Sequence, residues 1–338
     1  MDRDTNGSSV RSVCFCPNSH HLVVITQERD TLLTRTWPVQ RPSFTRVLDV
    51  EAEELCFWGQ GREACLVTVH ERVGELRVLR WPSLELVERR PYSGEGLNRV
   101  GDRHLVGRPS ALAWLDEGVL KLIRRGPPGR GPDEHRRPLM VADLPLPTNP
   151  WHMVGLATDA EGRRFISGAP GSALGWFCAE TWASHVLDTD LPDGHPFGHL
   201  MSPDGGRVAW CSRRLEFAEA PSNELLGSAI IEPDACHKWA GCFLPGGDLV
   251  FGVQIGRFWV IDLTRQTVHD VTDALGWAPV SSSVAMHRDP GNAQLQVSPD
   301  GQWLAVGCYG EVRCVETTRV VRARHAAPIH SRLQSGRR

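Results

Sequence analysis

The sequence predicts an all-β protein: a seven-bladed β-propeller built from four-stranded antiparallel blades. Three observations support this prediction: a turn motif that recurs, a nearly constant spacing between its copies, and almost no helical periodicity. The motif is clearest in VSPDGQWLAVG at 297–307 and MSPDGGRVAWC at 201–211. In each copy Pro fixes φ at the second turn position, Asp caps the turn, and Gly takes a backbone conformation that other residues avoid.

Related turns recur along the chain, and they set the repeat. They are CPNSHH near Asn18, WGQGRE near Gln60, TDAEGRR near Ala160, SPDGGR at Asp204, LPGGDL at Gly246 and SPDGQW at Asp300. The steps from 18 to 60, 160 to 204 and 204 to 246 are about 42 to 44 residues. One irregular unit fits between 60 and 160, and the last step carries an insertion. Four short strands in each unit of about 40–45 residues indicate a propeller, whereas a sandwich would lack a unit of constant length.

The repeat divides the chain into seven expected blades and a tail. The blades are expected at about 8–50, 51–93, 96–146, 150–191, 195–233, 236–274 and 281–325, and 326–338 is expected to be a basic, solvated C-terminal tail. In the third blade either Gly101-Asp102 or the stretch 107–110 could form the first turn. Both chain ends supply whole blades in this division, so the ring is expected to close by packing rather than by a shared blade.

The ends of the third strands carry a resemblance to a known family. The alternating stretches VLRWPSLELV (78–87), FWVIDLTRQTVH (258–269) and VRCVETTRVVR (312–322) each lead through a polar turn into a fourth short strand. The repeat resembles WD-repeat propellers, and its SPDG turns also resemble those of TolB-type and other bacterial propellers. WD repeats end this strand in Trp-Asp. Here the corresponding positions hold Trp37-Pro38, Trp81-Pro82, Glu180, Glu219, Asp262 and Glu316, and Gly198-His199 partly matches the family's Gly-His pair.

Composition restricts the class of protein. The chain has 338 residues, 41% hydrophobic and 23% charged, which fits a globular protein, and the net charge of −3 gives no electrostatic reason to expect nucleic acid or an anionic membrane. No secretory signal is visible at the N-terminus, and no apolar run approaches the roughly 20 residues of a membrane span. We expect the ten cysteines to be reduced and the protein to be cytoplasmic.

Motifs for catalysis are missing from the sequence. It contains no G-x-S-x-G nucleophile elbow, Gly-Lys phosphate loop, H-E-x-x-H, C-x-x-C or dinucleotide fingerprint. The glycine-rich GPPGRG at 126–131 is interrupted by prolines and is expected to be a loop. The sequence therefore favours a protein that is not an enzyme and that needs no cofactor or metal.

The first strand of each blade is expected to begin at one face of the ring, termed the top, and residues there surround the mouth of the central channel. A polar and aromatic set is expected there, including Arg11, Glu53, Glu54, Asn98, Arg99, Trp151, His152, His199, His237, Lys238, Trp239 and Gln294. Tryptophan and arginine are common at the energetic centres of interfaces. We predict partner contacts by Arg99, Trp151, His152, His199, His237, Trp239 and Trp277. The alternative is that propeller mouths are polar in general and that these tryptophans pack between blades.

Two sets of residues have side chains of the types that bind metal ions. His152, His199 and His237 occupy equivalent points of consecutive blades, but no carboxylate accompanies them. Lactonase-type propellers hold a divalent cation through acidic and amide side chains, for which Glu53, Glu54 and Asn98 are the candidates here. Neither set converges in the sequence as a catalytic site requires.

Two insertions interrupt the repeat. The segment 126–138 is rich in Pro, Gly and charge and is expected at the bottom face, opposite the top. The segment 275–292 joins two blades across the top and contains Trp277, Val280, Val284 and Met286. It either folds onto its own blades or presents an apolar patch to a partner.

The sequence thus predicts a WD-repeat-like scaffold that binds a protein or peptide partner on its top face, without nucleic acid or membrane. The alternative is a propeller enzyme of the lactonase or hydrolase type with a site at the channel mouth. A scaffold linked to nucleic acid is disfavoured by the even charge balance.

Overall fold

The computed structural model describes the chain from residue 8 to residue 334 with internal gaps. The described ranges are 8–28, 31–40, 46–93, 105–116, 119–125, 138–145, 154–168, 174–181, 183–187, 197–211, 214–220, 222, 224–229, 239–254, 256–277, 293–308 and 311–334. Of the predicted partner-binding residues, Arg99, Trp151, His152 and His237 lie outside these ranges.

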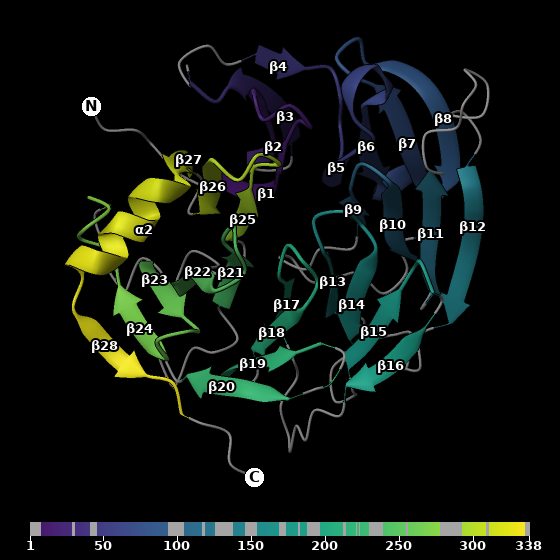
Figure 1. Ribbon diagram of the computed structural model, residues 1–338. Helices are drawn as coiled ribbons and strands as arrows, with labels where there is room; N and C mark the ends of the chain where they lie inside the picture. The colour runs from purple at the N-terminus through teal and green to yellow at the C-terminus, as the bar shows by residue number, and fades with distance from the viewer. Residues whose placement is uncertain are drawn as a thin grey trace.

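Seven antiparallel sheets form a ring, as Figure 1 shows, and this confirms the predicted seven-bladed propeller. Blade 1 contains β1 (Ser8–Phe15), β2 (His21–Glu28), β3 (Thr31–Pro38) and β4 (Arg46–Leu48). Blade 2 contains β5 (Glu54–Trp58), β6 (Cys65–His70), β7 (Glu75–Arg80) and β8 (Glu85–Pro91), with short 3-10 turns η1 (Gly61–Glu63) and η2 (Glu71–Val73). Blade 3 contains β9 (Leu105–Gly107), β10 (Ala111–Asp116), β11 (Val119–Arg125) and β12 (Pro138–Pro145).

The remaining four blades follow the same order from the inner to the outer strand. Blade 4 contains β13 (Val154–Thr158), β14 (Arg164–Gly168), β15 (Leu174–Cys178) and β16 (Ser184–Leu187). Blade 5 contains β17 (Phe197–Met201), β18 (Arg207–Cys211), β19 (Leu215–Glu219) and β20 (Leu225–Ala229). Blade 6 contains β21 (Trp239–Phe243), β22 (Leu249–Gln254), β23 (Arg257–Asp262) and β24 (Thr267–Asp270), and blade 7 contains β25 (Gln294–Val297), β26 (Trp303–Cys308) and β27 (Glu311–Glu316).

The ring closes by packing between the first and last blades. The innermost strands contact one another in the order β1, β5, β9, β13, β17, β21 and β25, and β25 contacts β1. Two hydrogen bonds cross this junction: Phe15 N–H donates to Gln296 Oε1 at 3.1 Å, and Asp300 N–H donates to Ser19 Oγ at 3.2 Å. Gly307 allows the close approach, because a Cβ there would lie 2.7 Å from Val10 Cγ1.

The recurring turn has a defined hydrogen-bond pattern at Ser298-Pro299-Asp300-Gly301. Ser298 Oγ donates to Asp300 Oδ1 at 2.6 Å and accepts the Trp303 N–H at 2.9 Å. Asp300 Oδ1 also accepts the Gln302 N–H at 3.0 Å, and Gly301 lies at φ +73°. The turn residues therefore satisfy the backbone groups that leave the β25–β26 ladder, which explains why this motif ends a strand and begins the next.

The same pattern appears in other blades with other residues. Ser202 and Asp204 repeat every one of these side-chain bonds, and Gly205 lies at φ +69°. In blade 1 Cys16 Sγ replaces the serine hydroxyl and accepts the His21 N–H at 3.0 Å, while Asn18 replaces the aspartate and Ser19 takes φ +60°. The sequence resemblance between CPNS and SPDG therefore reflects one turn geometry.

Neighbouring turns on this bottom face are also linked to each other through arginines. Arg108 Nε donates to Asp159 O at 2.9 Å, Arg164 Nη1 to Asp204 O at 2.8 Å, and Arg207 Nη1 to Gly247 O at 2.8 Å. Each bond joins one blade to the next, from blade 3 to blade 6. The first turn of blade 3 is formed by 107–110, where the Arg108 N–H donates to Ala111 O at 2.8 Å, and this selects between the two positions that the sequence allowed.

The seventh blade and the chain end differ from the expectation. Blade 7 has three described strands, and the residues expected to form its fourth strand are helix α2 (Thr317–Ala326). Residues expected as a solvated tail form β28 (Ile329–Arg332), which pairs antiparallel with β24 as a fifth strand of blade 6. Beyond it, Gln334 and Ser228 of β20 exchange backbone hydrogen bonds of 2.8 and 3.0 Å. The C-terminal segment thus runs around the outside of the ring from blade 7 to blade 5 (Figure 1).

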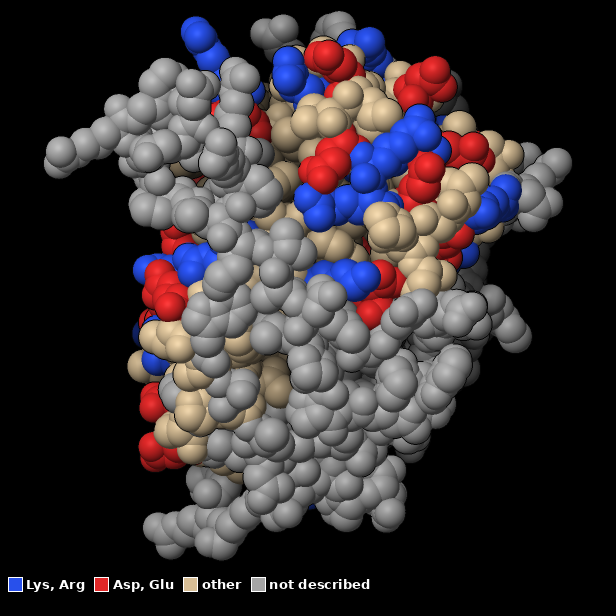
Figure 2. Space-filling model, turned by 90° about the vertical axis from the view of Figure 1, so that its right-hand side faces the viewer, with Lys and Arg blue, Asp and Glu red and all other residues tan. Residues whose placement is uncertain are grey.

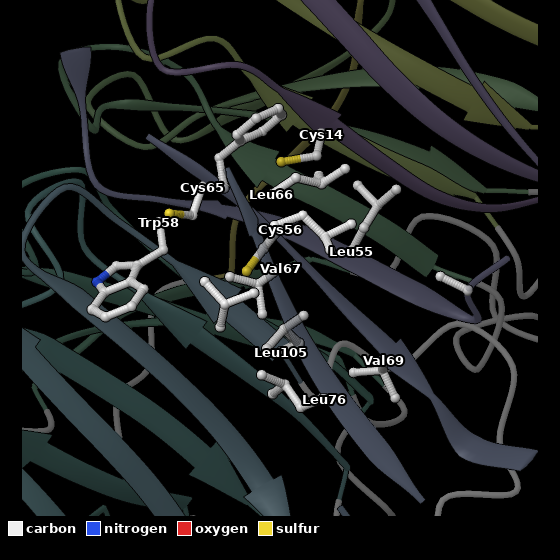
Figure 3. Packing of buried hydrophobic residues seen from close by; sticks show 14 of the residues in the cluster. Cys14, Leu55, Cys56, Trp58, Cys65, Leu66, Val67, Val69, Leu76 and Leu105 are labelled. Atoms are coloured by element: carbon white, nitrogen blue, oxygen red, sulfur yellow. The ribbon is translucent and has the colours of Figure 1, made fainter. Parts of the chain in front are cut away.

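The core lies between adjacent blades rather than in one central layer. Figure 3 shows one such cluster, in which Cys14 of blade 1, Cys56 and Cys65 of blade 2 and Leu105 of blade 3 pack together. Eight cysteines form no disulfide in the part of the chain where the structure describes their side chains. Burial raises the pKa of Cys308, and likewise of Cys314, to about 12, so these two thiols are poor nucleophiles at neutral pH.

Candidate recognition surface

The turns between first and second strands all lie at the bottom of the ring, so the top carries the connections between blades and the turns between second and third strands. The sequence assigned the predicted partner-binding residues to this face. Three of them are described: His199 on β17, Trp239 on β21 and Trp277 just after β24. The structure places all three beneath the surface, with exposed fractions of 7%, 6% and 8%.

Trp239 packs over the face of its own blade, in a cluster that also contains residues of blade 5. A Cβ on Gly252 of β22 would lie 1.8 Å from Trp239 Cη2, and a Cβ on Gly241 would lie 3.0 Å from its Cζ2. The two glycines therefore create the space that the indole fills. In this structure Trp239 is a packing residue and not an exposed anchor, which is the second of the two interpretations that the sequence left open.

Trp277 fills the junction between blades 6 and 7. Its ring centroid lies 4.2 Å from that of Phe258 in an edge-on arrangement, and the Arg313 Cζ of β27 lies 5.7 Å from the indole centroid. The start of the top insertion therefore folds onto its own blades. The rest of that insertion, 278–292, lies outside the described residues.

One polar group of the described top face lies over blades 1 and 2. Arg11 Nε on β1 donates to Gln27 Oε1 on β2 at 2.7 Å. The Glu71 N–H, in the turn between β6 and β7, donates to Glu53 Oε2 at 3.1 Å. Burial and the nearby Glu53 carboxylate raise the pKa of Glu71, while the positive charge of Arg11 acts in the opposite direction. Two carboxylates and one guanidinium thus share this part of the mouth, and we call Arg11, Gln27, Glu53 and Glu71 the blade 1–2 mouth.

Next to this mouth lies a buried polar cluster that holds the connection from blade 2 to blade 3. Asp116 is 4% exposed; its Oδ2 lies 2.8 Å from Lys121 Nζ, and its Oδ1 accepts the Ser93 N–H at 2.9 Å. Burial opposes ionisation of Asp116, but the bonds from Lys121 and Ser93 outweigh it and lower the pKa of the carboxyl. Burial, followed by the carboxylate of Glu54, raises the pKa of Tyr92. Asp116 is thus satisfied by Lys121 and Ser93, so its role here is structural.

The outer rim of blade 2 carries charges of both signs. Along β8 and its neighbours, Arg80 and Glu85 lie 3.4 Å apart, Arg89 and Glu75 3.6 Å, and Arg90 and Glu88 2.6 Å. Figure 2 shows blue and red side chains interspersed over the described part of this side. Charged residues on an outermost strand discourage edge-to-edge pairing with other chains, so this rim is a protected edge.

The residues considered for a metal site do not assemble one in the described structure. Within the described ranges no group of three or more His, Cys, Asp or Glu side chains is placed to hold a metal ion. Glu53 and Glu54 each accept a backbone N–H, from Glu71 and Leu105 respectively. Asn98, His152 and His237 lie outside the described ranges.

Sequence reasoning missed two members of the blade 1–2 mouth. It found Arg11 and Glu53 because they stand at the start of inner strands. Gln27 stands near the end of the second strand of blade 1, and Glu71 stands in the turn that follows the second strand of blade 2. Both positions face the top. Applying the same rule to the ends of second strands would have found them.

Comparisons with known proteins agree with the fold. No family model matches the chain, and no curated protein matches it. In the described residues no helix is long and apolar enough to cross a membrane. Among solved structures, part of the mitotic checkpoint complex matches with a TM-score of 0.61 and 10% identity, over 94% of this chain and 88% of that one.

Two further solved structures match to a similar extent. KlHsv2 with loop 6CD replaced by a Gly-Ser linker matches with a TM-score of 0.57 and 9% identity, over 92% of this chain and 93% of that one. The hydrazine synthase of Kuenenia stuttgartiensis matches with a TM-score of 0.55 and 10% identity, over 94% and 97%. At such identities the likeness shows the fold alone. In fold, the chain is a seven-bladed β-propeller.

Proposed function

We propose that this propeller is a non-catalytic interaction module that binds a protein or peptide partner on its top face. The observation that carries the proposal is the blade 1–2 mouth, where Arg11, Glu53 and Glu71 stand together at one end of a closed ring. A closed ring holds such side chains in fixed relative positions, which lowers the entropic cost of binding. Partner-binding roles for Arg99, Trp151, His152 and His237 stay predictions of the sequence.

The hypothesis of an interaction module also agrees with how the polar groups are used. The carboxylates considered for a metal, Glu53 and Glu54, accept backbone N–H groups, and Asp116 is neutralised by Lys121. Of the similar solved structures, one is a complex, the mitotic checkpoint complex, which is consistent with a role in assembly. We therefore expect a partner in a multi-protein complex, with the protein in the cytoplasm.

The test is affinity purification of the tagged protein from its own cells, compared across matched variants. The top-face variant combines Arg11→Gln with Glu71→Gln, and two further variants are Arg99→Ala and Trp151→Ala. The control is Gly246→Ala, in a bottom turn where a Cβ has open space around it. We expect the top variants to lose a partner that the wild-type protein and the control retain. If all variants retain the same partners, the top face is not the binding surface.

A separate measurement distinguishes loss of binding from loss of folding. Each variant is melted in parallel, and the variant that combines Arg11→Gln with Glu71→Gln should melt close to the wild-type temperature, because Arg11 is half-buried and Glu71 is exposed. A metal-dependent or hydrolytic turnover by the purified protein would instead contradict the proposal of a non-catalytic module.

A further inference from the structure

Blade 7 ends in an outer edge that differs from those of the other six blades. In the described structure β27 is the last strand of its sheet, whereas the third strand in each other blade is covered by a fourth. The side chains of β27 are correspondingly more exposed: Val312 and Cys314 are half-buried. On β23 of blade 6, by contrast, every residue from Phe258 to Asp262 is buried. The geometry of the ring thus leaves a position beside β27 that fits one more antiparallel strand.

The residues that follow β27 are complementary to it as a hairpin partner. With Thr317-Thr318 as a two-residue turn, residues 319–324 would run antiparallel to 311–316. The directly opposed pairs are then Glu316 with Arg319, Val315 with Val320, Cys314 with Val321, Arg313 with Arg322, Val312 with Ala323 and Glu311 with Arg324. Two pairs have opposite charge and three are apolar, which are the pairs that stabilise antiparallel strands. One pair, Arg313 with Arg322, is unfavourable, although Arg313 already has a partner in Glu311 at 2.9 Å.

In the structure these same residues form helix α2, which is held by contacts to blades 6 and 7. Val320 and Ala323 are buried against blade 6 and blade 7 residues. Arg324 Nη1 donates to Asp262 Oδ2 at 2.6 Å, and Arg319 Nη2 donates to Leu275 O at 2.9 Å. The N-cap residue Glu316 makes no side-chain capping bond, and β-branched Val320 and Val321 lower the intrinsic helix propensity. The helix is therefore maintained by tertiary contacts rather than by its own sequence.

The topology allows the segment to change state without moving β28. A fourth strand of blade 7 would run in the same direction as β24 and finish at the same face of the ring. Because β28 pairs antiparallel with β24, it begins at that face. Residues 325–328, about 13 Å long when extended, would then connect the fourth strand of blade 7 to β28.

We propose that the outer edge of β27 is a strand-binding position for residues 319–324 of this chain, which exchange between helix α2 and the fourth strand of blade 7. In the helical state no described strand pairs with the outer edge of β27. In the strand state it is closed, Val321 and Ala323 cover Cys314 and Val312, and Arg324 pairs with Glu311. The buried carboxylate of Asp262 opposes the exchange, because it loses Arg324 when the helix unwinds.

The experiment uses the full chain labelled with ¹³C-valine and ¹⁵N, and it follows the Cα shifts of Val320 and Val321 together with amide exchange on β27. The main variant is Asp262→Asn, which removes the buried charge that holds Arg324 but keeps an Oδ1 acceptor for the Arg265 N–H. We expect both valine shifts to move from helical to extended values and the amide exchange of β27 to slow severalfold. The control is Arg265→Gln, which should change neither measurement. The Arg265 side chain is exposed and lies 3.9 Å from the same carboxylate, whereas Arg324 lies 2.6 Å from it.

A second variant keeps the test decisive if Asp262→Asn is unstable. Val321→Ala replaces a β-branched, half-buried residue by a better helix former, so it favours the helix. In this variant the Cα shift of Val320 should stay helical and the amide exchange of β27 should stay fast. The proposal is wrong if Asp262→Asn gives random-coil valine shifts while β27 stays unprotected. It is also wrong if β27 is already protected in the wild-type protein and loses that protection when residues 1–7 are removed, since the N-terminal segment would then occupy the edge.

Discussion

The guanidinium of Arg324 on α2 lies 2.6 Å from the carboxylate of Asp262 at the end of β23, and their side chains are only 11% and 3% exposed. This ion pair joins the C-terminal segment to the interior of blade 6. Asp262 stands where the sequence placed the acidic residue that ends the third strand of a WD-like repeat. Its partner comes from a residue 62 positions later in the chain.

Replacing Arg324 by Met should destabilise the protein. The change leaves the Asp262 carboxylate buried without its main partner, which typically costs about 3–5 kcal/mol in the free energy of unfolding. Urea unfolding followed by tryptophan fluorescence measures it. Arg265→Met is the matched control, because Arg265 is exposed and contributes at most about 1 kcal/mol. Equal stability of the two variants would contradict a structural role for the pair.

Two bottom-turn glycines should respond differently to alanine. Gly301 and Gly246 both have positive φ, +73° and +93°, so alanine strains the backbone at either position. A Cβ on Gly301 would also lie 2.9 Å from Pro245 Cγ in the neighbouring blade, whereas Gly246 has nothing within 4 Å. We expect Gly301→Ala to lower the melting temperature more than Gly246→Ala, whose cost should be about 1–2 kcal/mol. The reverse order would show that Pro245 moves away from the added Cβ at position 301 at little cost in stability.

His70 should make the protein less stable in mild acid. Burial, followed by the charge of Arg77, lowers the pKa of His70 to about 4, although Glu75 and Glu51 oppose the shift. In the unfolded chain its pKa is near 6.5, so between these values the unfolded state binds more protons. The contribution of His70 is therefore complete above pH 6.5 and falls as the pH drops towards 4. Unfolding measured from pH 7 to pH 4 should show a shallower decline in His70→Gln, and identical slopes would refute the assignment.

Trp239→Ala should affect stability before binding. The indole is 6% exposed and fills the space over Gly241 and Gly252, so its removal leaves a large cavity and should cost about 3–5 kcal/mol. Chemical denaturation measures this loss. In the fraction that stays folded, partner retention in the affinity purification should match the wild-type protein. Loss of partner at full stability would instead support the sequence prediction that Trp239 is an anchor.

The bottom turns were predictable because their geometry is decided locally. Ser298, Asp300 and Gly301 satisfy the backbone within six residues, so the motif carries its own structure. The less similar CPNS of blade 1 was found for the same reason, since Cys16 and Asn18 supply the same acceptors. A repeat of such turns was enough to predict seven blades.

The end of the chain was not predictable in this way. A short fourth strand was expected at the end of VRCVETTRVVR (312–322), because an alternating third strand and a polar turn precede it. Residues 317–326 form a helix because Arg324 donates a hydrogen bond to Asp262 and Val320 packs at the junction of blades 6 and 7. Both contacts depend on the assembled ring. The burial of Trp239 is of the same kind: it depends on Gly252, a glycine of the neighbouring strand that the local sequence around Trp239 does not reveal.

The junction between β25 and β1 has a consequence for how the protein unfolds. In an open array of repeats the terminal units have a neighbour on one side only, and they fray first. Here the first and last blades are neighbours, joined through Phe15 to Gln296 and through Ser19 to Asp300. No blade is terminal, so the loss of any one removes two interfaces at once. The ring should therefore melt in a single cooperative step rather than shed its blades one after another from the chain ends.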